Sequence, residues 1–511
     1  MAQISVRRKL GWLLATNRRL GPDPALRCGN GFARAVGGST SPSSVTRWER
    51  GQVAAGRRTI RRYEQLLGLP TGQLTTVSDA MVRLETSTRL RTGVGRLDDV
   101  ALDTLLEKIG GDAPLHGAEW VQLTEQIESS PGLVLHPRRL WRTIAERLLT
   151  ELIVAEKGEW LHRSEAMSRL LEHPVARAHA VAACIALVED DTSPVVVEPL
   201  GLLDVVSDDT ANRYVFQQLT HPKGERAFQG ALRTASRKIR HGHFTESQLR
   251  RLAPVVREAL HDPPPDPDRL ALALDVARLL SGRAPARAAL RGMVPPDQPA
   301  ARWMWTSTRL AEPATARAVS LSLARLTQAQ HRSEAAEPDE VLAGVIEEAL
   351  YSSSPDRRLL HGQLLAATPL REALGNAFLT EATAGLGRRD ETFAVTALPA
   401  MTVLNVSTHR PLIGRILSGP GFSPTLRHAA ARALPHCPGR FPEPVWRTIL
   451  ARQLARSQGV TGRIEADVLR AIVYGIGTDG HTELLAAIRA DPALPPDCRS
   501  TAHWQLSQAR R

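Results

Sequence analysis

The sequence predicts an all-α protein in which a basic N-terminal unit of five short helices precedes an irregular α-solenoid, a stack of helical pairs without a strict repeat. Two observations carry this prediction. Aromatic residues make up 4% of the 511 residues and apolar residues 42%, whereas strands draw on aromatic and β-branched side chains to cover a pleated face. Apolar residues also recur at helical spacing between breaks rich in Pro, Gly and Asp.

The five N-terminal helices are marked by local start and stop signals. Asn30 is placed to cap the second helix. Ser41 and Pro42 are placed as cap and first residue of the third helix, which Gly51 ends in a left-handed conformation. The expected helices span 6–19, 31–36, 43–50 and 59–67, and a fifth runs through Leu74 and Val77.

Beyond this unit, residues 1–85, the sequence predicts a helical connector (86–136) and a helical-repeat domain (137–511). The connector contains expected helices at 98–109 and 118–129. Several later helices open with a polar residue and a proline, at His173-Pro174, Asp266-Pro267, Ser354-Pro355 and Ser423-Pro424. These prolines lie 93, 88 and 69 residues apart, so the array is only loosely like HEAT or tetratricopeptide repeats. The proline-rich segment 262–268 is a candidate subdivision.

The positive charge is concentrated at one end of the chain. The net charge is +12, and residues 1–75 hold 13 basic residues against Asp23, Glu49 and Glu64. The remaining residues are nearly neutral. Clustered arginines without acidic partners indicate a polyanionic partner.

Three motifs in the N-terminal unit fit one family. They are Phe32-Ala33-Arg34-Ala35-Val36-Gly37, Ser43-Ser44-Val45-Thr46-Arg47-Trp48-Glu49-Arg50-Gly51 and Leu66-Leu67-Gly68-Leu69-Pro70. Residues 6–80 thereby resemble the Cro/CI-like (XRE) helix-turn-helix transcriptional regulators, and the resemblance implies that helix 43–50 reads DNA. It also implies that Glu49 ties this helix to its bundle. Cys28 and Gly29 stand where the family commonly has a polar phosphate contact, and the connection 21–30 is longer than usual, so the register of the second helix is left open.

The spacing within helix 43–50 predicts which side chains face DNA. Val45 and Trp48 lie three apart and are expected to pack inward. That turns Ser43, Ser44, Thr46 and Arg47 outward, with Arg47 the candidate for a bidentate contact to guanine. Basic residues that follow within a turn or loop are expected to meet phosphates; they are Arg50, Arg57, Arg58, Arg61 and Arg62.

Other readings of the same residues stay open. The unit could be a helical protein-binding module that does not bind DNA, or its arginines could only solvate one face. Arg8, Arg18 and Arg19 fit either phosphate contacts or solubility.

Signatures of catalysis and of cofactor binding are weak. Residues 475–480 match a dinucleotide-binding glycine fingerprint, but they follow an expected helix rather than a strand. His428, His436 and Cys437, like His241 and His243, lack zinc-ligand spacing. The sequence therefore predicts no enzyme activity, no cofactor and no metal. The cysteines are far apart, no apolar run is long enough to span a membrane, and the N-terminal apolar run is too short for a leader, which favours the cytoplasm.

Together these features predict a cytoplasmic, sequence-specific DNA-binding transcriptional regulator. Its partners are expected to be double-stranded DNA and, through the helical body, another protein or a second copy in a homodimer. Two alternatives remain: a DNA-binding or stress-defence adaptor or scaffold without operator specificity, and a helical-repeat DNA-processing enzyme. The near-neutral charge of the body argues against the enzyme.

Overall fold

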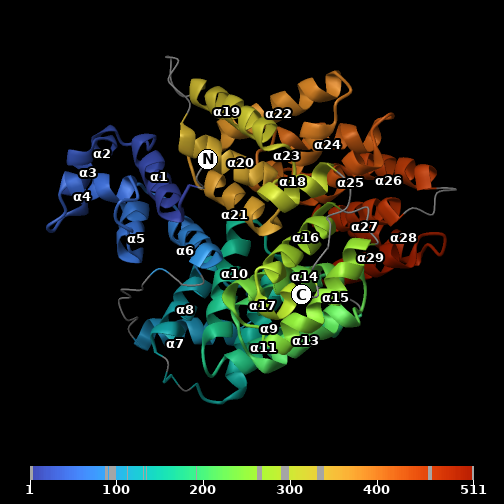
Figure 1. The fold of residues 1–511 in the computed structure, drawn as a ribbon, viewed down its shortest axis with the longest axis horizontal. Helices are drawn as coiled ribbons and strands as arrows, with labels where there is room; N and C mark the ends of the chain where they lie inside the picture. The colour runs from blue at the N-terminus through green and yellow to red at the C-terminus, as the bar shows by residue number, and fades with distance from the viewer. Residues whose placement is uncertain are drawn as a thin grey trace.

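The structure, a computed structural model, describes the chain apart from residues 1–3, 87–89, 91–98, 112, 131, 134, 192, 262–266, 289, 291–298, 331–338, 458–462 and 509–511. Helices follow one another from α1 to α29 (Figure 1), with 3-10 turns at Leu203–Val205 and Leu434–His436. The described residues contain no β-strand, and an isolated antiparallel bridge joins Arg309 and Ser352. The predicted all-α fold is confirmed. None of the helices in this described part is long and apolar enough to cross a membrane.

The first six helices, residues 4–86, form a unit that we call the head. The sequence predicted five helices; a short extra helix occupies the long connection after the first, with Asp23 as its cap. The next helix begins at Gly29 with Cys28 as its cap, so the expected cap at Asn30 was wrong. The helices are α1 Val6–Arg19, α2 Pro24–Arg27, α3 Gly29–Val36, α4 Pro42–Glu49, α5 Arg57–Leu66 and α6 Gln73–Thr86.

The rest of the chain forms two lobes, and the head stands at one side of the molecule and packs against both (Figure 1). The first lobe contains α7 Asp99–Gly110, α8 Gly117–Ser129, α9 Arg139–Val154, α10 Lys157–Glu172, α11 Arg177–Glu189, α12 Val197–Leu202, α13 Asp209–Thr220, α14 Glu225–His241, α15 Glu246–His261, α16 Pro267–Ser281, α17 Ala284–Arg287 and α18 Pro299–Ser307. The second contains α19 Pro313–Ala329, α20 Glu340–Tyr351, α21 Pro355–Ala366, α22 Arg371–Gly387, α23 Thr392–Leu404, α24 His409–Ser418, α25 Pro424–Ala433, α26 Glu443–Ser457, α27 Arg463–Thr478, α28 Thr482–Ala490 and α29 Pro496–Gln508.

Buried apolar side chains divide these units differently from the sequence prediction. One cluster runs from Leu105 to Met304 and fills the first lobe. The other joins the head to the second lobe, although they lie far apart in the chain. The expected connector is part of the first core, because α8 packs directly against α10. Helices α15 and α16 also pack together, so the core does not divide near 262–268, a segment whose residues 262–266 lie outside the described part.

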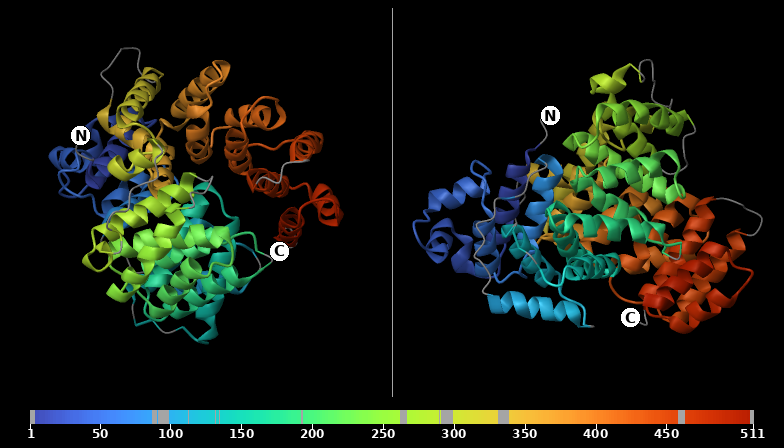
Figure 2. Two further views of the ribbon diagram at one scale, coloured as in Figure 1. Left: turned by 45° about the vertical axis from the view of Figure 1, so that its right-hand side comes forward. Right: turned by 90° about the horizontal axis from the view of Figure 1, so that it is seen from below.

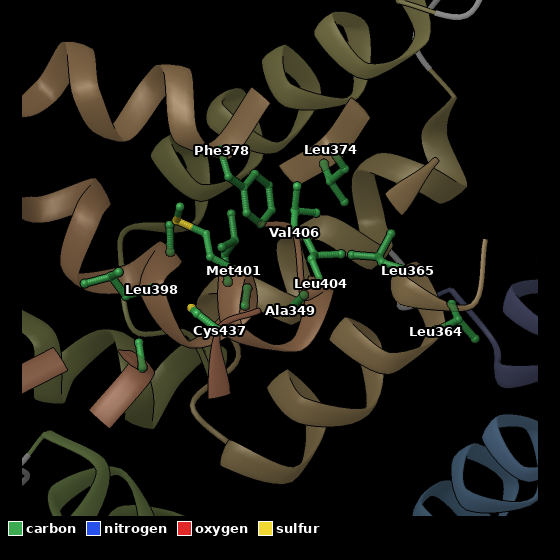
Figure 3. Packing of buried hydrophobic residues seen from close by; sticks show 14 of the residues in the cluster. Ala349, Leu364, Leu365, Leu374, Phe378, Leu398, Met401, Leu404, Val406 and Cys437 are labelled. Atoms are coloured by element: carbon green, nitrogen blue, oxygen red, sulfur yellow. The ribbon is translucent and has the colours of Figure 1, made fainter. Parts of the chain in front are cut away.

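The second lobe is a stack of helical pairs. Each odd-numbered helix from α21 to α29 packs on the next odd-numbered one, and Figure 2 shows the row curving from α19 to the C-terminal helices. The side chains of Phe378, Met401 and Leu404 are fully buried where these layers meet (Figure 3). This is the arrangement expected of an irregular helical-repeat array.

Polar caps followed by proline open two of the predicted helices. Ser354 and Ser423 accept hydrogen bonds from the backbone N–H groups of their own first turns, and Pro355 and Pro424 begin α21 and α25. His173-Pro174 differs: the His173 ring accepts hydrogen bonds from the backbone N–H groups of Val175 and Ala176, and α11 begins only at Arg177. Pro267 begins α16, while Asp266 lies outside the described residues.

The glycine fingerprint at residues 475–480 is the end of α27 and the turn that follows it. A Cβ on Gly475 would lie 2.7 Å from the ring of Trp446, and one on Gly477 would lie 2.5 Å from Gln505. Asp479 accepts hydrogen bonds of 2.9 Å from the Trp446 indole and the Phe441 backbone, and it pairs with Arg410. These glycines therefore permit close helix packing and do not form a strand-to-helix phosphate loop.

Candidate nucleic-acid interface

Helix α4 is held in place by its cap, its exit and two inward side chains. Ser41 accepts a 3.2 Å hydrogen bond from the backbone of Ser44, and Gly51 has a φ of +66°. Val45 is 1% exposed, and Trp48 is half-buried against the same core. This is the orientation that the helical spacing predicted.

The opposite face of α4 is polar and open to solvent. Ser43, Thr46 and Arg47 are exposed and Ser44 is half-buried. The hydroxyls of Ser43 and Ser44 lie 2.8 and 3.0 Å from that of Ser41, and Thr46 donates to the carbonyl of Pro42. The Arg47 side chain forms no hydrogen bond or ion pair with any described residue. Its guanidinium is therefore available to a ligand.

A buried ion pair fixes α4 to α1. Glu49 is 5% exposed and accepts hydrogen bonds of 2.6 and 2.7 Å from the guanidinium of Arg18. The hydroxyl of Tyr63 donates to the same carboxylate at 3.1 Å, and burial together with Glu49 raises the pKa of Tyr63. The hydrogen bond to Glu49 also raises the pKa of Arg18. Arg18 thus serves neither phosphate contact nor solubility, because it is used to orient α4.

The structure corrects the expectation for Arg57. This side chain is 2% exposed, pairs with Asp79 at 2.9 Å, and also pairs with Glu125 on α8. Arg169 on α10 lies 3.0 Å from the same Asp79 carboxylate. Arg57 therefore belongs to a buried ionic cluster between the head and the first lobe, and it cannot reach a phosphate.

The other four arginines expected at phosphates stay at least partly at the surface. Arg50 and Arg58 are exposed, whereas Arg61 and Arg62 are half-buried. Arg61 pairs with Glu125, and Arg62 donates to the carbonyl of Ala35 at 2.8 Å. These contacts leave part of each guanidinium free to bind phosphate.

Two further arginines lie beside α4: Arg8, which the sequence left open between phosphate contact and solubility, and Arg7, which it did not single out. Arg8 donates to the carbonyl of Arg50 at 3.2 Å, and Arg7 and Arg8 are both exposed. A Cβ on Gly51 would lie 2.7 Å from the backbone of Arg7, and one on Gly11 would lie 2.6 Å from the carbonyl of Trp48. The available signal was Gly11 in the middle of a helix, which indicates a close backbone approach.

The outer surface of the head keeps most of the arginines of residues 4–75 but only one of the three carboxylates in that range. Glu49 is buried by Arg18, and Glu64 accepts hydrogen bonds of 2.7 to 3.1 Å from the backbone at the start of α6. Asp23 is the one exposed carboxylate among residues 4–75. Ten arginines reach this surface at least in part: Arg7, Arg8, Arg19, Arg27, Arg34, Arg47, Arg50, Arg58, Arg61 and Arg62. We call them the head arginines.

The head docks on the second lobe through α1, away from α4. The Lys9 ammonium lies 2.7 Å from Nε2 of His361, and Trp12 donates to Asp339 at 2.8 Å. Asn17 donates to the carbonyl of Ala367 at 3.0 Å. Helix α4 packs on α1 and α3 and stands at the outer edge of the molecule (Figure 1).

The buried Lys9–His361 contact predicts a dependence of stability on pH. Burial, followed by the charge of Lys9, lowers the pKa of His361 to about 3. The unfolded chain therefore takes up a proton at about pH 6.5 that the folded chain does not bind. Stability contributed by neutral His361 is present above about pH 6.5 and is lost as the pH falls from there toward about 3.

His361→Gln should flatten the acid side of the stability curve by about 1.4 kcal/mol per pH unit between pH 6 and 4. The measurement is urea unfolding followed by circular dichroism, and the matched control is His503→Gln at an exposed site. Equal slopes for wild type and His361→Gln would contradict the assignment.

Comparison with protein-family models and with curated proteins finds no match for this chain.

Proposed function

We propose that this protein is a sequence-specific DNA-binding transcriptional regulator, of the helix-turn-helix type that its head resembles. The observation that carries the proposal is that the exposed polar helix α4 lies among the head arginines. Asp23 is the one exposed carboxylate in residues 4–75. A duplex presents phosphates on both sides of a major groove that is wide enough for one helix.

The proposed contacts follow from the geometry of α4. Ser43, Ser44, Thr46 and Arg47 would face base edges, with Arg47 bidentate to a guanine. Arg50 and Arg58 would bind phosphates on either side, together with Arg7 and Arg8 beside the exit of α4. Arg61 and Arg62 would contribute with the part of each guanidinium that their internal contacts leave open.

The first test is selection of bound sequences from random duplexes, followed by fluorescence anisotropy on the best duplex and on a scrambled one. We expect Arg50→Ala and Arg58→Ala each to weaken binding to both duplexes and to reduce the slope of log affinity against log salt by about one. The control is Arg142→Ala, an arginine on α9 whose side chain is 70% exposed and which pairs with Glu146. Unchanged salt slopes for the head variants would contradict phosphate contacts there.

The same selection separates the alternatives. An adaptor without operator specificity would bind duplexes with the same salt dependence but enrich no sequence. A DNA-processing enzyme would change the bound DNA, which denaturing gels of the recovered duplex would reveal. The regulator is favoured because the head arginines surround the exposed polar helix α4.

The helical body is proposed to bind a second copy or another protein. The head is fixed to both lobes, so two heads can match two half-sites about 34–36 Å apart only if the bodies hold them at a set distance. Sedimentation of the full chain with and without the selected duplex tests this: a homodimer predicts two chains per duplex and a repeated half-site. One chain on a duplex without repeat would contradict it.

We place the regulator in the cytoplasm. Cys184, Cys437 and Cys498 are buried free thiols, and burial raises the pKa of Cys184 and of Cys437 to about 12. Such thiols are unreactive packing groups, as expected in a reducing compartment. Fractionation of cells that express the tagged chain would test this location.

A further inference from the structure

The head meets the first lobe through ion pairs in which the head supplies most of the cations. Arg57 and Arg61 of α5 both pair with Glu125 of α8, and Arg83 of α6 pairs with Glu165 of α10. Among the described residues of the first lobe, Leu161 is the one buried apolar residue in the cluster that the head shares with the second lobe. The head is therefore joined to the first lobe more by charge than by apolar contact.

The carboxylate of Glu125 stands between two head arginines, as a phosphate could. Glu125 is 3% exposed; its Oε1 accepts a hydrogen bond from Arg57, and its Oε2 accepts one from Arg61. Arg57 is buried and also pairs with Asp79 of the head itself, so it stays internal. Arg61 differs, because 36% of its side chain is exposed. Arg61 is therefore the arginine for which Glu125 and an external anion can compete.

Arg61 lies beside a proposed phosphate contact. Residues three apart in a helix are neighbours on its surface, so Arg61 is adjacent to Arg58 on α5. Arg58 is exposed. A guanidinium released at Arg61 would extend the basic surface around Arg58 toward the same strand of a bound duplex.

The pair between Arg61 and Glu125 can open without leaving a buried charge uncompensated. Glu125 keeps its pair with Arg57, and a second buried cation, Arg169, lies 4.0 Å from it. The guanidinium of Arg61 can form the same charge-assisted hydrogen bonds with a phosphate as with a carboxylate. The head also keeps the apolar core that it shares with the second lobe. Exchange of Glu125 for a phosphate therefore requires no unfolding of the head.

We propose that Glu125 forms an autoinhibitory contact: it holds Arg61 of the head and thereby lowers the affinity of the protein for DNA. This inference rests on the proposed function, because DNA is the ligand that would be withheld from Arg61. It adds a regulatory role for the first lobe, since movement of α8 away from α5 would strengthen DNA binding without any change in α4.

The test is fluorescence anisotropy of the full chain on the scrambled duplex, with Glu125→Gln as the variant that keeps the side-chain shape and removes its charge. At about 0.1 M salt we expect affinity to rise roughly 3- to 10-fold and the slope of log affinity against log salt to steepen by about one. Glu107→Gln, at an exposed position on α7, removes the same charge and should change affinity by less than about twofold. Wild-type affinity in folded Glu125→Gln, or an equal gain in Glu107→Gln, would overturn the proposal.

A double variant shows whether the gain depends on Arg61. Arg61→Ala introduced into Glu125→Gln should remove the gain in affinity and restore the wild-type salt slope, because the released guanidinium is then missing. If the gain persists without Arg61, Glu125 acts through another group and the assignment is overturned.

Circular dichroism shows which variants are folded. If Glu125→Gln does not fold because Arg57 loses its partner, single variants at the surface of α5 decide the question. Arg61→Ala should then weaken binding to the scrambled duplex less than Arg58→Ala does, since Arg61 is already held by Glu125. Equal losses would show that Glu125 withholds nothing from DNA.

Retention on immobilised heparin separates this proposal from the proposed function. Heparin is a polyanion without base sequence, so it reports a released arginine even if the protein binds no duplex. Glu125→Gln should elute at higher salt than wild type and Glu107→Gln, and Arg61→Ala should cancel the difference. Failure to bind DNA together with this shift would contradict the regulator alone, whereas unchanged elution of folded Glu125→Gln would overturn the autoinhibitory contact.

Discussion

Replacing Arg57 with alanine is expected to destabilise the folded protein by about 3–5 kcal/mol. The guanidinium lies between the buried carboxylates of Asp79 and Glu125. Removing it leaves two buried negative charges with Arg169 as their remaining fully buried cation. Because Glu125 lies on α8 in the first lobe, the substitution should weaken the contact between the head and α8.

The adjacent arginine provides a matched control. Arg58 is exposed, so Arg58→Ala should change stability by less than about 0.5 kcal/mol while weakening DNA binding. Urea unfolding of both variants by circular dichroism, with limited proteolysis to follow release of the head, makes the comparison. Equal stability of Arg57→Ala and Arg58→Ala would contradict the role given to the ionic cluster.

Replacing Arg47 with alanine is expected to abolish most of the preference for the selected operator. A bidentate contact to guanine discriminates by about 1–3 kcal/mol, so affinity for the operator should fall roughly 5- to 150-fold. Binding to a scrambled duplex should fall much less, because only one positive charge is lost. The fold should be unaffected, since Arg47 is exposed and its side chain forms no hydrogen bond or ion pair with a described residue.

Fluorescence anisotropy on the operator and on the scrambled duplex gives the ratio of the two affinities. The control is Arg19→Ala, which removes an exposed head arginine that lies on α1 and not on the reading helix α4. That variant should lower both affinities in proportion or leave them unchanged. If Arg47→Ala keeps the wild-type ratio of operator to scrambled affinity, α4 is not the reading helix.

The candidate site was predictable to the extent that it depends on helical periodicity. A helix has 3.6 residues per turn, so Val45 and Trp48 are expected to face inward and Arg47 to face outward. The structure agrees with both expectations. Arg57 and Arg58 could not be told apart in this way. They are neighbours at the start of α5. Arg57 is buried and Arg58 is exposed because Glu125 and Asp79, on other helices, pair with Arg57.

The sequence by itself determined the helices, since caps, prolines and apolar spacing act over a few residues: Ser41 starts α4 and Gly51 ends it. It also determined that positive charge gathers at one end of the chain. Only the tertiary structure decided which charges remain at the surface and that the head shares a core with the second lobe. Lys9 meets His361 across 352 residues, and Arg57 meets Glu125 across 68. Such pairings depend on how whole helices pack, and no local pattern in the chain specifies them.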